Sequence, residues 1–385
     1  DNLVAYDHYL QGLEQIQKET REGLIAGITS FNIAIEEDPN FAQPYAYLAI
    51  SHYFLDLFQV EKKHIEDINT YADKAILLDP DLNESLIGKA LYYMQTGQFE
   101  LAIQFFDKVL ARDPNSGWIH NLLSTIYSLH QPNSENYLRH SIRGIQFAVT
   151  GKDSNNISLA YLHLSNALAQ NGFLPEAEPY LKQSLSYNEN NLFSGILSVY
   201  VELGQTQDFD RAYQRFQDLL AKDNTSLPVL NEAAKIAFYQ RKYEAAWQYY
   251  RQLLAIQEQA GLDVYPGEEY KIAYVLQQLG RPMEAKPYLD QYLAFLQQEQ
   301  STYRHLGFAV YYASISEKAQ AMAALQTFSQ QGSYENWLVT YIAHDPLIQS
   351  LSDQPEYQAT LQRIQDGFQQ QHQQVREVLE AEGLL

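Results

Sequence analysis

The sequence predicts an all-α solenoid, in which helical hairpins stack and each hairpin buries one face against the next. Pro39, Pro80 and Pro114 each follow an aspartate and each close a run of helix-forming residues, as expected because proline cannot continue a helix. Pro80 and Pro114 lie 34 residues apart, which is the length of one helix–turn–helix repeat. No stretch alternates apolar and polar residues as a strand does. We therefore expect a right-handed superhelix of about nine hairpins with a C-terminal capping helix.

The clearest single repeat ends at Pro114. With that proline at the end of the second helix, Ala90 and Ala102 fall where the two helices of a hairpin cross closely. Phe106 falls where a bulky residue fills the remaining gap. This order of small and bulky residues is the pattern of the tetratricopeptide repeat. Such repeats build a concave surface and bring no chemistry of their own, so the question becomes what the chain holds.

The other hairpins follow in order along the chain. The first four are expected at residues 2–38, 42–79, 83–114 and 118–149. The next five pair residues 159–170 with 174–187, 193–203 with 209–221, 228–240 with 243–257, 268–279 with 282–297, and 302–315 with 317–330. The tail predicts short helices at 333–343 and 355–364 and a polar helix at 365–382. A solenoid needs such an end to hide its last apolar face from water.

The strongest loop signal in the chain is the Gly-Lys-Asp-Ser-Asn-Asn run at residues 151–156. We expect it to join two sub-stacks. The predicted organisation is an N-terminal sub-stack at 1–150, a C-terminal sub-stack at 151–332 and capping helices at 333–385.

Composition excludes several classes of partner and of chemistry. The formal charge is −21, so the chain is expected to repel nucleic-acid phosphates and anionic lipid. There is no cysteine, which excludes disulfides, thiolate catalysis and cysteine-ligated zinc. No apolar run approaches the roughly 20 residues that span a bilayer. We expect neither nucleic-acid binding nor membrane insertion by this segment.

No pattern predicts an enzyme or a cofactor. Gly-rich phosphate loops, Gly-x-Ser-x-Gly and His-Glu-x-x-His are all missing from the sequence. His52, His120 and His163 lie in the first helices of different hairpins, and we expect them to be isolated because a metal site needs several ligands to converge. Glu268-Glu269, like Glu36-Glu37, lies at a helix end and is interpreted as terminal or solvated charge. We predict no catalytic residues, no metal and no cofactor.

Candidate contact residues lie at positions of the first helices that point into the concave face of such a stack. They are aromatic, apolar or amide side chains, namely Tyr53, Phe54, Met94, Trp118, Asn121, Asn166, Phe238, Tyr270 and Tyr274. Such a groove suits an amphipathic helix, an extended segment of a protein or the chain's own tail. The alternative is that the superhelical twist buries these side chains against the next repeat. The nearby cations Lys89, Lys235 and Lys271 do not form one cluster, so a clamp for a C-terminal carboxylate is not expected.

Stretches at both ends carry a more specific pattern than a generic repeat. They are Ala5-Tyr6-Asp7-His8-Tyr9-Leu10-Gln11-Gly12, Thr20-Arg21-Glu22-Gly23-Leu24, the run from Phe31 through Asp38-Pro39 to Ala49, and Asp345-Pro346-Leu347 followed by Pro355-Glu356-Tyr357. Together they resemble the repeat region of bacterial class III adenylate/guanylate cyclases and of winged-helix or AraC-type regulators. In those proteins an N-terminal effector domain precedes a long tetratricopeptide array, often across one membrane helix. The resemblance implies a sensory or partner-binding module and slightly favours an extracytoplasmic location.

The expected function is a non-catalytic scaffold that binds a protein, peptide or ligand in its groove, as the sensor part of a larger bacterial signalling or transcription regulator. A free-standing assembly scaffold or chaperone adaptor is the alternative. The sequence upstream of Asp1 separates the two, because a membrane helix and an effector domain there would identify the sensor.

Overall fold

The structure is a computed structural model that describes residues 2–18, 20–57, 62–131, 133–148, 154–262, 264–299 and 301–385. Every regular element in these ranges is a helix, which confirms the predicted all-α stack of hairpins. No helix among the described residues combines the length and the apolar character needed to cross a membrane.

The chain divides into two compact units, Asp1–Leu123 (unit 1) and Ser124–Leu385 (unit 2). The predicted joint at 151–156 begins outside the described residues, and the boundaries at 150 and 332 stay predictions. Unit 1 contains the hairpins α1 (Leu3–Ile16) with α2 (Arg21–Glu37), α3 (Ala42–Asp56) with α4 (Ile65–Leu78), and α5 (Asn83–Gln95) with α6 (Phe99–Arg112). The next helix, α7 (Gly117–Thr125), runs across the boundary and continues into a π-helical turn, Ile126–His130.

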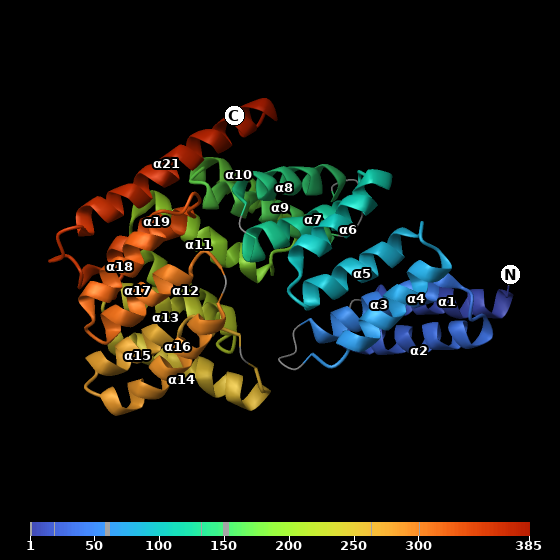
Figure 1. Cartoon of the computed structure of the whole chain (residues 1–385), viewed down its shortest axis with the longest axis horizontal. Coiled ribbons are helices and arrows are strands. Elements are labelled where there is room, and N and C mark those ends of the chain that lie inside the picture. Colours follow the sequence, from blue (N-terminus) through green and yellow to red (C-terminus); the bar gives the residue numbers. More distant parts are fainter. Residues whose placement is uncertain are drawn as a thin grey trace. The chain divides into compact units, whose positions relative to one another are not determined.

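Unit 2 continues the same order of helices (Figure 1). Its paired helices are α8 (Ser134–Ala148), α9 (Ser154–Gln170), α10 (Leu174–Tyr187), α11 (Leu192–Thr206), α12 (Phe209–Lys222), α13 (Leu227–Tyr239), α14 (Tyr243–Ala260), α15 (Glu269–Gln278), α16 (Pro282–Gln298), α17 (Arg304–Ser314) and α18 (Lys318–Phe328). Among the described helices, α1 to α6 and α9 to α18 make eight consecutive pairs, and α8 packs against the π-helical turn Ile126–His130, in agreement with a prediction of about nine hairpins.

The Asp-Pro signal has a physical cause in the turn after each second helix. Asp38, Asp79 and Asp113 end α2, α4 and α6, and each carboxylate accepts the backbone N–H two residues later, at 3.1, 3.0 and 3.2 Å. In unit 2, Asn188 and Asp223 make the same turn at 3.0 and 2.9 Å without a following proline. The acceptor side chain therefore defines the turn, and the proline reinforces it.

Small residues allow the paired helices to approach closely. Ala90, Ala102 and Phe106 are fully buried, which confirms the predicted register of the α5–α6 repeat. The unusual glycine of the first motif has the same role, because a Cβ atom on Gly12 would lie 2.3 Å from a ring carbon of Phe31. Gly12 is thus a position of close approach between α1 and α2.

The tail differs from the prediction in its last helix, which is continuous, and in the segment 336–348, which does not extend the stack. Its helices are α19 (Asn336–Tyr341), a short 3-10 turn (Ile342–His344), α20 (Pro346–Gln349) and α21 (Tyr357–Ala381). The prediction of separate helices at 355–364 and 365–382 is wrong, because Ile364 and Phe368 continue one buried stripe of α21. From α18 and α19, α21 reaches the turn between α9 and α10 (Figure 1). The segment 336–348 does not follow α21. It packs on first helices of the unit 2 hairpins, namely α9, α11 and α17.

Candidate functional site

Unit 2 contains a cavity of about 480 Å³ between its first helices and the segment 336–348. The walls come mainly from α9, α11, α13, α15 and α17, which are the first helices of five hairpins, with further residues from α10 and α16. This is the face that the repeat pattern predicts to be concave. The segment 336–348 closes one side of the cavity, and no residue of α21 lines it.

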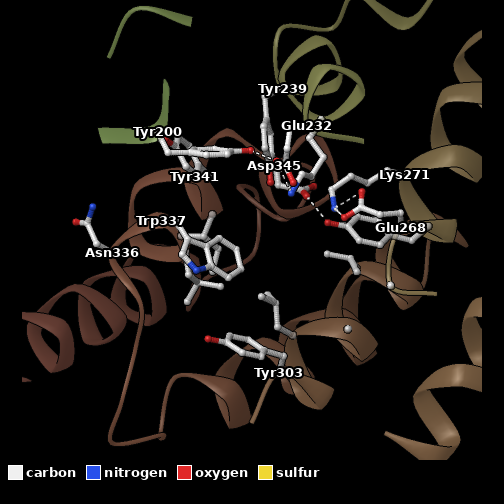
Figure 2. Close-up of a pocket in the computed structure, with 18 of the residues that line it drawn as sticks. Tyr200, Glu232, Tyr239, Glu268, Lys271, Tyr303, Asn336, Trp337, Tyr341 and Asp345 are labelled. Atoms are coloured by element: carbon white, nitrogen blue, oxygen red, sulfur yellow. Dashed lines mark hydrogen bonds and ion pairs between the residues drawn. The ribbon is translucent and has the colours of Figure 1, made fainter. Parts of the chain in front are cut away.

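One side of the cavity is aromatic. The rings of Tyr239 and Tyr341 stack with their centres 5.7 Å apart, and Tyr200 lies 6.1 Å from Tyr341. Trp337 and Tyr303 lie 6.0 Å apart at the other end of this wall. Trp337 is 41% exposed, so its indole ring is accessible to a ligand. In Figure 2, Trp337 stands apart from the ionisable side chains that gather near Asp345.

A network of ion pairs adjoins this wall, where the hydroxyl of Tyr200 donates to the Glu232 carboxylate. Lys235 pairs with Glu232 at 2.7 Å, and Lys271 pairs with Glu268 at 3.0 Å. The two residues of each pair are three positions apart, within α13 for the first pair and at the start of α15 for the second. They therefore lie about one turn apart on the same face of the helix. The hydroxyl of Tyr250 donates to Glu268 at 3.2 Å. The network is therefore held by two successive hairpins.

The pKa shifts show how closely these groups interact. Burial opposes ionisation of Glu268, but Lys271 and Lys235 outweigh burial and lower the pKa of its carboxyl. Burial likewise opposes the charge of Lys235, and the carboxylates of Glu232 and Glu268 outweigh it and raise the pKa of the ammonium group. Both groups are thus held in their charged forms.

Asp345 links the segment 336–348 to this network. It is 4% exposed, and burial raises the pKa of its carboxyl. Its Oδ1 accepts the backbone N–H of Leu347 at 2.8 Å, which caps the start of α20, and its Oδ2 accepts the hydroxyl of Tyr270 at 3.2 Å. Asp345 therefore positions the closing segment against α15.

Glu335 is a titratable group at the Trp337–Tyr303 end of the aromatic wall. The indole N–H of Trp337 donates to its carboxylate, and Tyr303 bonds the same side chain. Burial raises the pKa of Glu335 from 4.5 to about 7. The charge next to Trp337 therefore changes in the neutral pH range.

We expect the emission of Trp337 to titrate near pH 7 in the wild-type protein, because Glu335 gains its charge there. The folded protein holds this proton more tightly than the unfolded chain, so the stabilising contribution of Glu335 is full below about pH 4.5 and is lost as the pH rises through about 7. Tryptophan emission of the folded protein across this pH range measures the titration. Unfolding followed by the same emission at each pH measures the change in stability, and both are compared with Glu335→Gln. A transition that survives in Glu335→Gln would assign the titration to another group.

The structure places the residues predicted from sequence in three environments. Asn166 and Tyr270 line the cavity, and the Asn166 amide donates to the Tyr137 hydroxyl at 2.9 Å. Phe238 is fully buried and packs against Tyr274 with ring centres 5.9 Å apart. The others lie in unit 1: Tyr53 is buried, Phe54, Met94 and Asn121 are partly buried, and Trp118 is 39% exposed. Their role in binding stays a prediction.

The ionic half of the cavity was not predicted from the sequence. Glu268 was interpreted as terminal or solvated charge; it is terminal, as the N-cap residue of α15, but not solvated, since its side chain is 15% exposed and ion-paired. Lys235 and Lys271, treated as separate, share the neighbourhood of Glu268. A signal was present: Glu-x-x-Lys occurs at 232–235, inside α13, and again at 268–271, at the start of α15.

Comparison with known proteins bears on the fold. Residues 84–116, which cover most of the α5–α6 hairpin, match the tetratricopeptide repeat family. No curated protein matches the sequence.

Solved structures of low sequence identity resemble the chain. A tetratricopeptide repeat protein from Parabacteroides merdae is 14% identical, with 66% of this chain and 93% of that chain covered and a TM-score of 0.47. Pseudomonas aeruginosa pilF is 15% identical, with 66% and 99% covered and a TM-score of 0.35. The human IFIT1 dimer with PPP-AAAA is 16% identical, with 72% and 70% covered and a TM-score of 0.47. The chain is thus an all-α protein of helical hairpins that contains a tetratricopeptide repeat at residues 84–116.

Proposed function

We propose that the chain is a non-catalytic binding module, and that the unit 2 cavity holds a short peptide segment carrying a basic side chain. The observation that carries the proposal is the composition of the cavity wall. Four carboxyl groups line it, on Glu232, Glu268, Glu299 and Asp345, against the two ammonium groups of Lys235 and Lys271. The volume of about 480 Å³ suits a ligand of a few residues at most.

Aromatic and acidic walls together favour a cation. The faces of Trp and Tyr rings attract a guanidinium or ammonium group by about 0.5–2 kcal/mol. A carboxylate that accepts a charge-assisted hydrogen bond from the same group adds roughly 1.5–3 kcal/mol. The chain's charge of −21 steers a basic segment toward this surface.

The test is a titration with acetyl-triarginine amide, with acetyl-triglutamate amide as the charge-reversed probe. We expect the basic peptide to change tryptophan emission and the acidic peptide to leave it unaltered. Trp337→Phe should remove most of the emission change, because Trp337 lines the cavity. Glu232→Gln should weaken binding about 10-fold, the equivalent of about 1.4 kcal/mol.

A matched control separates the cavity from the general negative charge. Glu284→Gln removes the same charge from an exposed ion pair with Arg281, outside the cavity. It should leave the affinity unaltered. Equal weakening by Glu232→Gln and Glu284→Gln would show that the peptide binds the surface non-specifically and would contradict the proposal.

We further propose that this module is the sensory part of a larger bacterial signalling or transcription regulator, placed outside the cytoplasm. The support is the resemblance of the stretches at residues 5–49 and 345–361 to the repeat regions of such regulators. A free-standing assembly scaffold or chaperone adaptor would bind peptides in the same way. The gene upstream of Asp1 distinguishes them, because a scaffold would lack an effector domain.

A further inference from the structure

In unit 1, the hairpin α3–α4 brings together two imidazoles and a carboxylate. His52 lies in α3, His64 comes immediately before α4, and Asp67 lies in the first turn of α4. Each offers one potential ligand atom, and the three atoms lie within 4.8 Å of one another. Among the described residues, no other three His, Asp or Glu side chains meet this closely.

The distances are near those of a metal site. Zinc bonds nitrogen and oxygen ligands at about 2.0–2.2 Å, so two ligands of one tetrahedral ion lie roughly 3.4 Å apart. His64 Nδ1 and Asp67 Oδ2 are already 3.1 Å apart. The imidazole rings of His52 and His64 have centres 4.6 Å apart. A side-chain adjustment of about 1 Å brings all three groups within range of one ion.

His52 has an unpartnered nitrogen. The residue is 8% exposed, and its Nδ1 is buried with no hydrogen-bond partner. An unsatisfied buried polar atom costs about 1–3 kcal/mol. Burial, together with the nearby His64, lowers the pKa of His52. The prediction that His52 is isolated is wrong, because its ring lies beside that of His64.

Neighbouring residues contact the backbone of His64 and the imidazole of His52. Asp56, which is 2% exposed, accepts the backbone N–H of His64 at 2.7 Å. The ring of Tyr71 stacks on His52 with centres 5.7 Å apart and planes at 9°. Such supporting contacts orient the ligands of metal sites.

We propose that His52, His64 and Asp67 bind a divalent transition metal ion of the Zn²⁺ type. Two imidazoles and one carboxylate are a donor set that suits this class of ion, and water fills the remaining positions. The ion joins α3 to the start of α4. The site lies in unit 1, so it goes beyond the peptide binding proposed for unit 2.

The experiment uses the untagged full chain after treatment with a chelator. Calorimetric titration with Zn²⁺ should show one ion bound per chain, and Co²⁺ should give the visible absorption of a protein-bound ion. His64→Gln and Asp67→Asn should each weaken Zn²⁺ binding at least about 10-fold. Because both side chains are partly exposed, circular dichroism should show that the variants keep their fold.

The matched control is His305→Gln, which removes an exposed histidine from unit 2. It should leave the affinity and the stoichiometry unaltered. Zn²⁺ should also raise the midpoint of thermal unfolding in the wild type and in His305→Gln, and to a smaller extent in His64→Gln. Zn²⁺ affinity that is unaltered by both His64→Gln and Asp67→Asn, or the absence of Zn²⁺ binding, would overturn the proposal.

Discussion

Replacing Lys271 with alanine is expected to lower the free energy of unfolding by about 3–5 kcal/mol. Lys271 is 7% exposed and pairs at 3.0 Å with Glu268, which is 15% exposed. Removing the ammonium group leaves the buried Glu268 carboxylate without its nearest counter-charge. This unpaired charge destabilises the protein more than the loss of the Lys271 side chain alone would. Urea unfolding followed by circular dichroism measures the difference.

An exposed ion pair in the same unit provides the control. Lys286 pairs with Asp290 at 2.7 Å in α16, where the two side chains are 69% and 63% exposed. Lys286→Ala should change the free energy of unfolding by about 0–1 kcal/mol, because water already solvates both charges. If Lys271→Ala and Lys286→Ala lower the free energy of unfolding equally, the Glu268 carboxylate is not buried as the structure describes.

A double variant tests the origin of the effect. In Glu268→Gln combined with Lys271→Ala, no buried carboxylate remains unpaired at this position. We expect this double variant to be more stable than Lys271→Ala alone, since the penalty comes from the orphaned charge. A double variant less stable than Lys271→Ala would instead show that side-chain packing dominates at Lys271.

The periodic part of the fold could be predicted because each of its signals acts locally. An aspartate that ends a second helix accepts a backbone N–H two residues later. A small residue such as Ala102 meets its partner helix within one hairpin. Neither signal depends on residues far along the chain, so the pattern alone locates the hairpins and their concave face.

The cavity could not be predicted in the same way. Its closing segment, 336–348, has no repeat period, and Tyr270 meets Asp345 across 75 residues of sequence. Glu268 meets Tyr250 of the preceding hairpin, while its sequence context resembles any acidic helix end. The His52–His64 pair was missed for a related reason, because His64 lies outside a regular helix position. Convergence of polar groups depends on tertiary folding, which helical periodicity does not encode.

Deleting residues 365–385 is expected to destabilise unit 2 and to promote association. The deleted part of α21 buries Phe368, Val375 and Leu379, and each such side chain contributes about 1.5–3 kcal/mol. His372 stacks on Phe173 with ring centres 4.1 Å apart, so the deletion also exposes Phe173. We expect a lower unfolding midpoint, binding of an apolar dye and a larger hydrodynamic radius.

Two single substitutions in α21 distinguish packing from a loss of chain length. Phe368→Ala should lower the free energy of unfolding by about 3–5 kcal/mol, because Phe368 is 5% exposed within the core of unit 2. Gln370→Ala, on the exposed face of the same helix, should stay within about 0.5 kcal/mol of the wild type. Gln371 adds a polar contact to this packing, since its amide donates to Asn171 Oδ1 and Ser134 Oγ, both at 2.9 Å. A truncated chain that stays monomeric and equally stable would mean that α21 is a free arm, whereas the structure makes it the cap of this stack.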